Sequence, residues 1–308
     1  MQALSWLVVA ALVTGCKAAE SRPDEVARAP SAAPSTSAPA RADAPSTSAP
    51  ARKADAPSTA ATPSPSGAAA VSPSARADAG VAWQLRCLAK HYDATVDGDA
   101  LVTSRGERVP LRAPGARTLD ERLDSTTAED VFAPRYSVGP VAPVTDPGAD
   151  PGRFRPTPVF RAVYGGTPAE VERGLVAVDF VGKKIRVHRR ARPAFEAVSA
   201  KLAALVAADA SLASWFEGMG GTYNFRPIAG TDRLSAHSFG VAIDLATARS
   251  HYWRNDGAKL VWKNLVPQSI VDAFESSGFV WGGRWYHYDT MHFEWRPEIF
   301  DPACRPDG

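Results

Sequence analysis

The chain has 308 residues, a formal net charge of +2 and 45% hydrophobic residues. A net charge so close to zero excludes strong electrostatic attraction to nucleic acid, so we expect no nucleic-acid partner. The length is sufficient for two domains, but the composition changes along the chain and favours a single folded region behind a long leader.

The first residues, 1–15, predict a secretory signal peptide. Their apolar run from Trp6 to Val13 is too short to span a bilayer. It is followed by Thr14-Gly15-Cys16, and the whole resembles a bacterial lipobox, in which Cys16 becomes the lipidated first residue. The alternative is an ordinary signal peptide that contains a cysteine. Lys17 follows Cys16, which favours the outer membrane in a Gram-negative cell. We therefore expect an exported protein, lipid-anchored to the bacterial envelope on its periplasmic side.

Residues 16–82 predict a disordered tether. They consist mainly of Ala, Pro, Ser and Thr, and the sequence APSTSAPAR at residues 33–41 recurs at residues 44–52. Such a segment has too few large apolar side chains to offset the entropy lost on ordering. Proline extends it, so its expected role is to give an anchored domain a long reach. A binding motif for a partner is the alternative.

The chain has three cysteines. If Cys16 carries lipid, Cys87 and Cys304 remain as a pair in an oxidising compartment. They flank the region expected to fold, residues 83–308, so a disulfide between them would join its two ends. Two separate thiols are the alternative.

The folded region begins near Trp83. Residues 83–150 are rich in turns and lack a clear period, so we expect them to wrap around the main core, with one short helix within residues 120–136. Thr167-Pro168-Ala169-Glu170 then has the pattern of a helix start, with an N-cap Thr, Pro at the first helical position and Glu at the third.

The periodicity is clearer after this point. Residues 175–181 and 184–189 predict a β-hairpin. A long helix is expected from Pro193, and a second from Pro267 with Gly278 as its stop. Their apolar positions recur at helical spacing and predict core faces formed by Phe195, Val198, Leu202 and Leu205 and by Ile270, Val271 and Phe274. Helices and strands alternate irregularly, which favours an α+β fold with a small antiparallel sheet and flanking helices.

The most informative stretch is Ser235-Ala236-His237-Ser238-Phe239-Gly240-Val241-Ala242-Ile243-Asp244. From Val241 onward, apolar side chains alternate with small ones and Asp244, which predicts a strand with one carboxylate on its open face. Gly240 permits a tight bend that brings His237 back over this strand. For His237 and Asp244 alone, a capping histidine and an exposed aspartate would be the better interpretation.

A second motif, Asp289-Thr290-Met291-His292-Phe293-Glu294, lies near the C-terminus. In a strand, His292 and Glu294 share one face. With His237 and Asp244, His292 completes two imidazoles and a carboxylate, which is the ligand set of a catalytic Zn²⁺ site with a fourth position left for water. The paired motifs therefore predict a zinc centre.

The patterns S-x-H-x-x-G-x-A-x-D and D-x-M-H-F-E resemble the zinc D-alanyl-D-alanine carboxypeptidase and L-alanyl-D-glutamate peptidase family, most clearly from Gly221 to Pro297. The resemblance implies the small α+β fold shared with the Hedgehog signalling domain, and zinc ligands His237, Asp244 and His292. Many relatives have a catalytic Glu three residues before the last histidine. Asp289 stands there in this chain, as in the endopeptidase and phage-endolysin branch, and is our choice for the general base.

Other roles follow from the resemblance and from side-chain chemistry. Glu294 is the second candidate for the base, or else it holds a ligand imidazole through a hydrogen bond. Relatives carry an arginine near Arg226 that meets the substrate, and a guanidinium suits a carboxylate or an oxyanion. A surface salt bridge is the alternative. Further candidate substrate contacts are Arg233, Ser235, Trp281 and Tyr288.

The sequence thus predicts a monomeric zinc peptidase domain over residues 83–308 that hydrolyses peptidoglycan stem peptides with a metal-activated water. Release of D-alanine and internal cleavage both remain open, and Asp289 favours internal cleavage. The principal alternative is a non-catalytic wall-binding lipoprotein that keeps the fold. A second alternative is an amidase or an unrelated zinc hydrolase.

Overall fold

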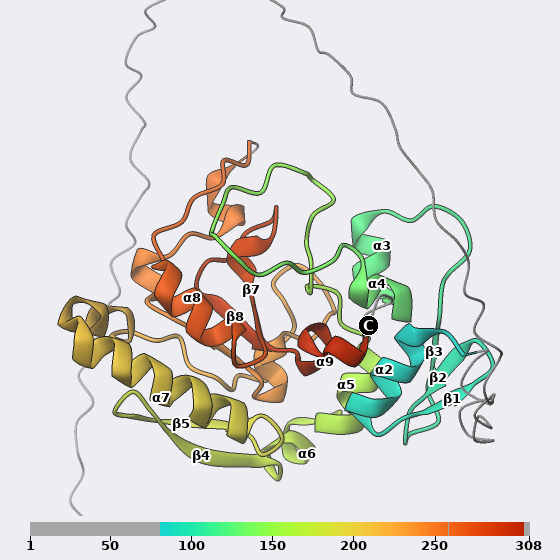
Figure 1. The fold of residues 1–308 in the computed structure, drawn as a ribbon. Coiled ribbons are helices and arrows are strands. Elements are labelled where there is room, and N and C mark those ends of the chain that lie inside the picture. The colour runs from blue at the N-terminus through green and yellow to red at the C-terminus, as the bar shows by residue number, and fades with distance from the viewer. Residues whose placement is uncertain (1–80, 258, 305–308) are drawn as a thin grey trace, which may run out of the picture. The chain divides into compact units, whose positions relative to one another are not determined.

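The computed structural model describes residues 81–257 and 259–304 (Figure 1). The predicted signal peptide, the lipidation site at Cys16 and the tether up to residue 80 lie outside these residues. Within the two described ranges, no helix is long and apolar enough to cross a membrane.

Residues 83–150, which we expected only to wrap around the main core, contain helices and strands of their own. Helix α2 (Trp83–Tyr92) is followed by strands β1 (Thr95–Asp97), β2 (Ala100–Val102) and β3 (Arg108–Pro110). The three strands form an antiparallel meander in the order β1-β2-β3. Helix α2 packs against this sheet through leucines that are completely buried, Leu85 and Leu88.

The single helix expected within residues 120–136 is two short helices, α3 (Leu119–Asp124) and α4 (Ala128–Phe132). Each begins with its own capping box, Thr118 with Glu121 and Thr127 with Asp130. A capping box satisfies the free backbone N–H groups at a helix start, so two boxes nine residues apart specify two starts.

The middle of the chain follows the sequence prediction closely. Helices α5 (Thr157–Tyr164) and α6 (Pro168–Glu172) precede the hairpin of β4 (Leu175–Phe180) and β5 (Lys183–His188), and α7 (Arg192–Ala208) follows. The predicted capping box of α6 is present. On α7, the predicted stripe buries Phe195, Val198 and Leu202, and the helix lies along β4 and β5 (Figure 1).

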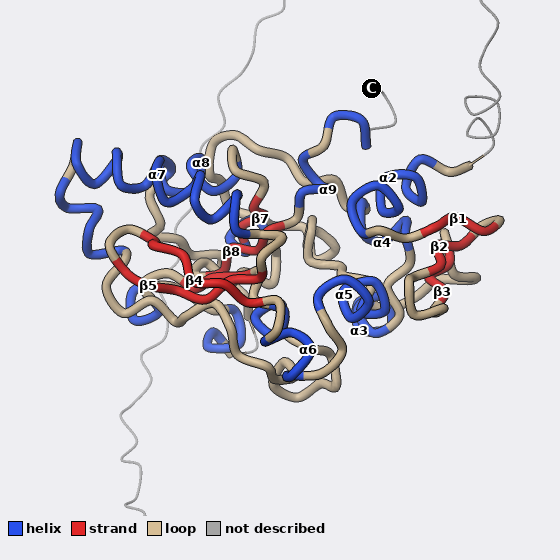
Figure 2. Tube along the Cα trace, turned by 90° about the horizontal axis from the view of Figure 1, so that it is seen from below, coloured by secondary structure: helices blue, strands red, loops and turns tan. Residues whose placement is uncertain are grey.

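The third sheet carries both motifs. It consists of β6 (Ala242–Asp244), β8 (His292–Trp295) and β7 (Phe279–Trp281), paired antiparallel in the order β6-β8-β7. Helix α8 (Gln268–Glu275) packs against β7 and against α7. In Figure 2, α7 and α8 lie side by side on the same side of strands β4, β5, β7 and β8. Helix α9 (Pro297–Phe300) follows β8 directly.

Cys87 of α2 and Cys304 form a disulfide. It links the first helix of the described region to the end of that region, next to α9. The pairing considered from the sequence is therefore the one in the structure, and both cysteines are buried.

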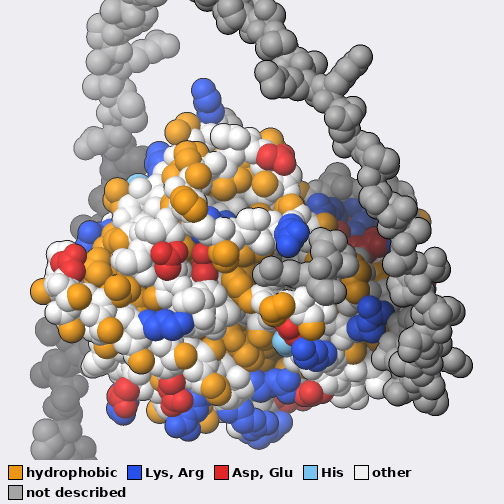
Figure 3. Space-filling model, in the orientation of Figure 1, with side chains coloured by type: hydrophobic (Ala, Val, Ile, Leu, Met, Phe, Trp, Pro, Cys, Tyr) orange, Lys and Arg blue, Asp and Glu red, His pale blue; other side chains and the backbone are white. Residues whose placement is uncertain are grey.

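The described region is mixed helix and small antiparallel sheets, as the α+β prediction requires. On the face that Figure 3 draws, hydrophobic side chains are scattered among Lys, Arg, Asp and Glu side chains. A surface of mixed charge agrees with the small net charge of the whole chain.

Candidate active site

Strand register brings Asp244 and His292 together. In the β6–β8 pair, Asp244 lies opposite His292 and Ala242 lies opposite Glu294. Ile243 is completely buried on the other face, as the alternation of the sequence predicted. Residues opposite each other on one face of an antiparallel pair have adjacent side chains, so the pairing itself positions two of the three predicted ligands.

His237 reaches the same place from a short 3₁₀ helix, Ala236–Phe239. The helix ends at Gly240, whose φ of +65° is in the left-handed region. A Cβ at Gly240 would lie 2.6 Å from a methyl group of Leu175 and 3.0 Å from the backbone nitrogen of His188. Only glycine fits this bend, which turns the chain from the helix into β6 and places His237 above it.

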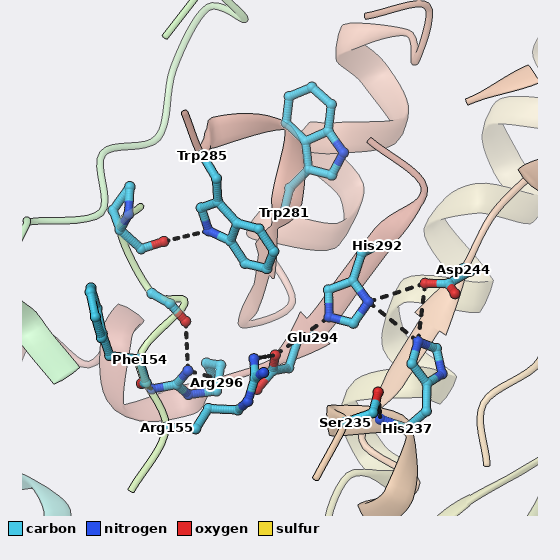
Figure 4. Close-up of polar contacts among 12 residues, drawn as sticks. Phe154, Arg155, Ser235, His237, Asp244, Trp281, Trp285, His292, Glu294 and Arg296 are labelled. Carbon is cyan, nitrogen blue, oxygen red and sulfur yellow. Dashed lines mark hydrogen bonds and ion pairs between the residues drawn. The ribbon is translucent and has the colours of Figure 1, made fainter. Parts of the chain in front are cut away.

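The three side chains converge (Figure 4). Nε2 of His237 lies 3.1 Å from Oδ1 of Asp244 and 3.3 Å from Nδ1 of His292, and Nδ1 of His292 lies 3.1 Å from the same oxygen. Tetrahedral zinc ligands at the usual bond lengths are separated by about 3.3–3.4 Å. The donor set and its spacing therefore fit one zinc ion bound by Nε2 of His237, Nδ1 of His292 and a carboxylate oxygen.

Glu294 lies on the side of the His292 ring that faces away from Asp244 (Figure 4). Its Oε2 is 3.4 Å from Nε2 of His292 and accepts a hydrogen bond from Arg155 at 2.6 Å. Glu294 is completely buried and does not line the cavity beside the ligands. This corrects its candidacy as the catalytic base, because it cannot reach a substrate. It occupies instead the position of a carboxylate that fixes the orientation of a ligand imidazole.

Asp289 lines the same cavity as His237, Asp244 and His292, which we call the metal-side cavity after these three predicted ligands. Its Oδ1 is shielded from solvent and accepts no hydrogen bond from any described side chain or backbone group. Burial raises the pKa of Asp289 to about 7, with nearby His292 opposing this and Asp244 adding to it. An unpaired carboxylate oxygen beside a ligand cluster is suited to accept a proton from a bound water.

The electrostatics of the cluster favour a cation. Burial would lower the pKa of the His292 imidazole, but Asp244 and Glu294 raise it to about 10. Burial would likewise raise the pKa of Glu294, but Arg155 and His292 lower it to about 2. Negative charge is thus held beside His292, and a dication bound by deprotonated ligands would be stabilised there.

Arg226 and Ser235 line the metal-side cavity, which has a volume of about 290 Å³. The segment around Arg226 is tied to the His237 helix, because the hydroxyl of Ser238 accepts a hydrogen bond from the Arg226 backbone N–H at 3.0 Å. Arg226 itself is exposed and forms no ion pair within the described part of the chain. Arg233 does not line this cavity, and it pairs with Asp124 at 2.5 Å.

Two of the predicted substrate contacts are core residues. Trp281 and Tyr288 are completely buried and do not line the metal-side cavity. The indole N–H of Trp281 donates to the backbone oxygen of Thr290 at 3.0 Å, which keeps the ring inside the fold. The aromatic walls of the cavity are different residues, Tyr252, Trp253 and Trp285.

Sequence reasoning missed the contribution of the segment before α5. Arg153 and Arg155 both line the cavity, and Asp150, which is completely buried, pairs with His287 at 2.8 Å. The only sequence signal was the alternation of the two arginines about Phe154, which is buried. His287 lies in this pair and outside the cluster of His237, Asp244 and His292.

A family model described as D-alanyl-D-alanine carboxypeptidase matches residues 229–295. The matched segment contains His237, Asp244, Asp289 and His292, whereas Arg226 and Arg155 lie before it. The chain matches no curated protein. The match supports a peptidase active site in this segment of the chain.

Proposed function

We propose that the protein is a zinc peptidase that hydrolyses peptidoglycan stem peptides. The observation that carries the proposal is the meeting of His237, Asp244 and His292 in one cavity with Asp289, whose carboxylate oxygen Oδ1 is unpaired. A zinc ion on these ligands would supply a Lewis acid that polarises the scissile carbonyl and acidifies a water molecule.

Asp289 performs the proton transfers in this proposal. Its unpaired Oδ1 accepts the proton of the attacking water and later returns it to the leaving amine. The partial burial of the carboxylate and its raised pKa keep its basicity close to neutral pH. A module that only binds the wall has no use for such a group, so this residue favours the enzyme over the binding protein.

Arg226 is the proposed substrate contact. It lines the metal-side cavity and has no carboxylate partner among the residues that the structure describes. Its guanidinium is therefore available to hold a substrate carboxylate or the carbonyl oxygen as that oxygen gains charge. Removal of this contact would weaken substrate binding, transition-state stabilisation or both.

We further propose that the peptidase is exported and lipid-anchored through Cys16 at the outer membrane, facing the periplasm. The Cys87–Cys304 disulfide supports an oxidising compartment. Residues 16–82 would then let the anchored domain reach the cell wall as a monomer.

Mass spectrometry of the products tests the activity. The full chain, loaded with zinc, is incubated with purified stem peptides and muropeptides, beside Asp289→Asn and the control Asp272→Asn, which changes an exposed carboxylate on α8. We expect cleavage by the unaltered chain and by Asp272→Asn. We expect a rate about 10²–10⁴-fold lower for Asp289→Asn, with zinc still bound.

The fragment masses separate release of a terminal D-alanine from cleavage inside the peptide. Loss of the amide bond between glycan and peptide would identify an amidase instead. Zinc binding with retention of the wall material and without any cleavage would favour the wall-binding lipoprotein and contradict the proposal.

A further inference from the structure

A small pocket beside the metal-side cavity is lined by four arginines, Arg153, Arg155, Arg233 and Arg254, and by no acidic residue. We call it the arginine pocket. It shares Arg153, Arg155 and Tyr252 with the metal-side cavity, so the two hollows adjoin. One ligand can therefore reach both the arginine pocket and the three predicted metal ligands.

The contacts of these arginines do not use all of their N–H donors. Arg153 and Arg155 each donate to one buried carboxylate, at 2.5 and 2.6 Å. Arg254 donates to the backbone oxygen of Ala229 at 2.6 Å and, within the described ranges, forms no ion pair. A guanidinium carries several N–H donors in a planar fork, so these single contacts leave further donors for a ligand.

The pocket also gathers positive charge in a confined space: Arg153, Arg155 and Arg233 each have a carboxylate partner, and Arg254 has none among the described residues. The side chains of Arg153, Arg155 and Arg233 are only 17%, 14% and 15% exposed. Burial lowers the pKa of Arg155, and its neighbours Arg296 and Arg153 lower it further, while Glu294 opposes them. An anion placed among these groups would relieve their repulsion.

The size of the pocket limits the anion. Its volume of about 40 Å³ exceeds the roughly 10–15 Å³ that one water molecule needs. A carboxylate group fits this space, whereas a whole amino-acid residue does not. Carboxylates are also the groups that a guanidinium fork binds with two parallel hydrogen bonds.

We infer that the arginine pocket binds a free carboxylate of the substrate while the scissile bond lies at the metal ligands. This inference rests on the proposed function and names its substrate class: peptides that carry a free carboxylate close to the bond that is cut. Two sources share this chemistry, the C-terminal carboxylate of the peptide and the free carboxylate of a glutamyl residue within it.

Binding measurements on a variant that does not turn over separate these sources. The full chain with Asp289→Asn, loaded with zinc, is titrated calorimetrically with four peptides: a stem pentapeptide, its C-terminal amide, its glutamyl amide and the double amide. We expect one of the two single amidations to weaken binding by about tenfold or more, because it removes charge-assisted hydrogen bonds. The amidation that does so identifies the carboxylate that is bound.

A second variant links this carboxylate to the pocket. Adding Arg254→Gln should weaken binding of the free acid about tenfold and leave binding of the sensitive amide unchanged. In the active enzyme, Arg254→Gln should raise KM and preserve kcat. Arg192→Gln is the matched control, since Arg192 is an exposed arginine on α7 that lines neither hollow, and it should change neither constant.

The inference is overturned if both single amides bind as tightly as the free acid, or if a folded Arg254→Gln protein binds the acid with unchanged affinity. Cleavage of the peptides with either of these results would leave the proposed function intact. Carboxylate-dependent binding without cleavage by the unaltered chain would support this inference and contradict the proposed function. If Arg254→Gln fails to fold, Arg254→Lys, which keeps the charge but removes the planar fork of donors, takes its place in the same comparison.

Discussion

His292 and Asp244 face each other across two antiparallel strands, and Nδ1 of His292 lies 3.1 Å from Oδ1 of Asp244. The two residues are 48 positions apart in the sequence. A register shift of one residue between β6 and β8 would turn one of the side chains to the opposite face of the sheet. Correct pairing of these two short strands is therefore a condition for the metal centre.

Replacing a ligand should abolish tight metal binding. In His237→Ala the cluster loses one of its three donors. Loss of a residue that only supports a ligand lowers metal affinity by roughly 10–100-fold, so we expect a larger fall in zinc affinity here. Competition with a chromogenic chelator measures this. His251→Ala is the matched control, because His251 is a histidine outside the ligand cluster. Equal affinities in the two variants would exclude the proposed ligand.

Glu294→Gln should damage both stability and metal binding. The change leaves Arg155 buried without its carboxylate, and breaking a buried ion pair in this way costs about 3–5 kcal/mol in the free energy of unfolding. Weaker support of His292 should also lower zinc affinity about 10–100-fold. Urea unfolding of the metal-free protein and chelator competition measure the two effects separately.

The double variant Arg155→Leu with Glu294→Gln tests the cause of that instability. Because it removes the buried positive charge as well, it should lose less free energy of unfolding than the sum of the two single changes. Strict additivity would mean that the two side chains do not act as a pair.

Local patterns were sufficient to predict the parts of the fold that flank the site. The capping box at Thr167, the β4–β5 hairpin and the buried stripe of α7 each depend on neighbouring residues, which a sequence displays directly. The three strands β1 to β3 were not predicted. Each has only three residues, which is too short for an alternating pattern to stand out.

The convergence of His237, Asp244 and His292 was predicted for the same reason, since each of them lies in a compact motif. The wrong substrate contacts were aromatic residues close to His292 in the sequence, but Trp281 and Tyr288 point into the core. Arg155 was missed because its partner Glu294 is 139 residues away. Contacts at such separations follow from tertiary packing, which no local period reveals.

The stability of the protein should fall in mild acid because of His188. Burial and the neighbouring Arg189 and Arg190 lower the pKa of this imidazole from 6.5 to about 4. Between these values the unfolded chain binds a proton that the folded chain does not, so the free energy of unfolding decreases as the pH falls from about 6.5 to about 4. The full effect is about 3 kcal/mol.

Urea unfolding of His188→Asn between pH 7 and pH 4, roughly the range over which the imidazole titrates, checks this. The variant is expected to be less stable at neutral pH, because it leaves a cavity. Its free energy of unfolding should nevertheless depend less steeply on pH than that of the unaltered chain. Identical slopes would show that His188 is not the group responsible.

Reduction of the disulfide should loosen the folded region. Cys87 and Cys304 are 217 residues apart, so the crosslink restricts a long loop in the unfolded chain. We expect its loss to lower the free energy of unfolding by about 2–5 kcal/mol. Guanidinium unfolding with and without a reductant measures the difference, and the variant with serine at both positions should not respond to the reductant.

The most direct test of the account is a titration of the metal-free full chain with zinc while stem-peptide hydrolysis is followed. We expect no hydrolysis without zinc, a rate that rises in proportion to added zinc, and a break at one equivalent. The break should vanish in His237→Ala. Hydrolysis that persists without metal, or zinc bound at one equivalent in the three-ligand cluster with no hydrolysis of any stem peptide, would contradict it.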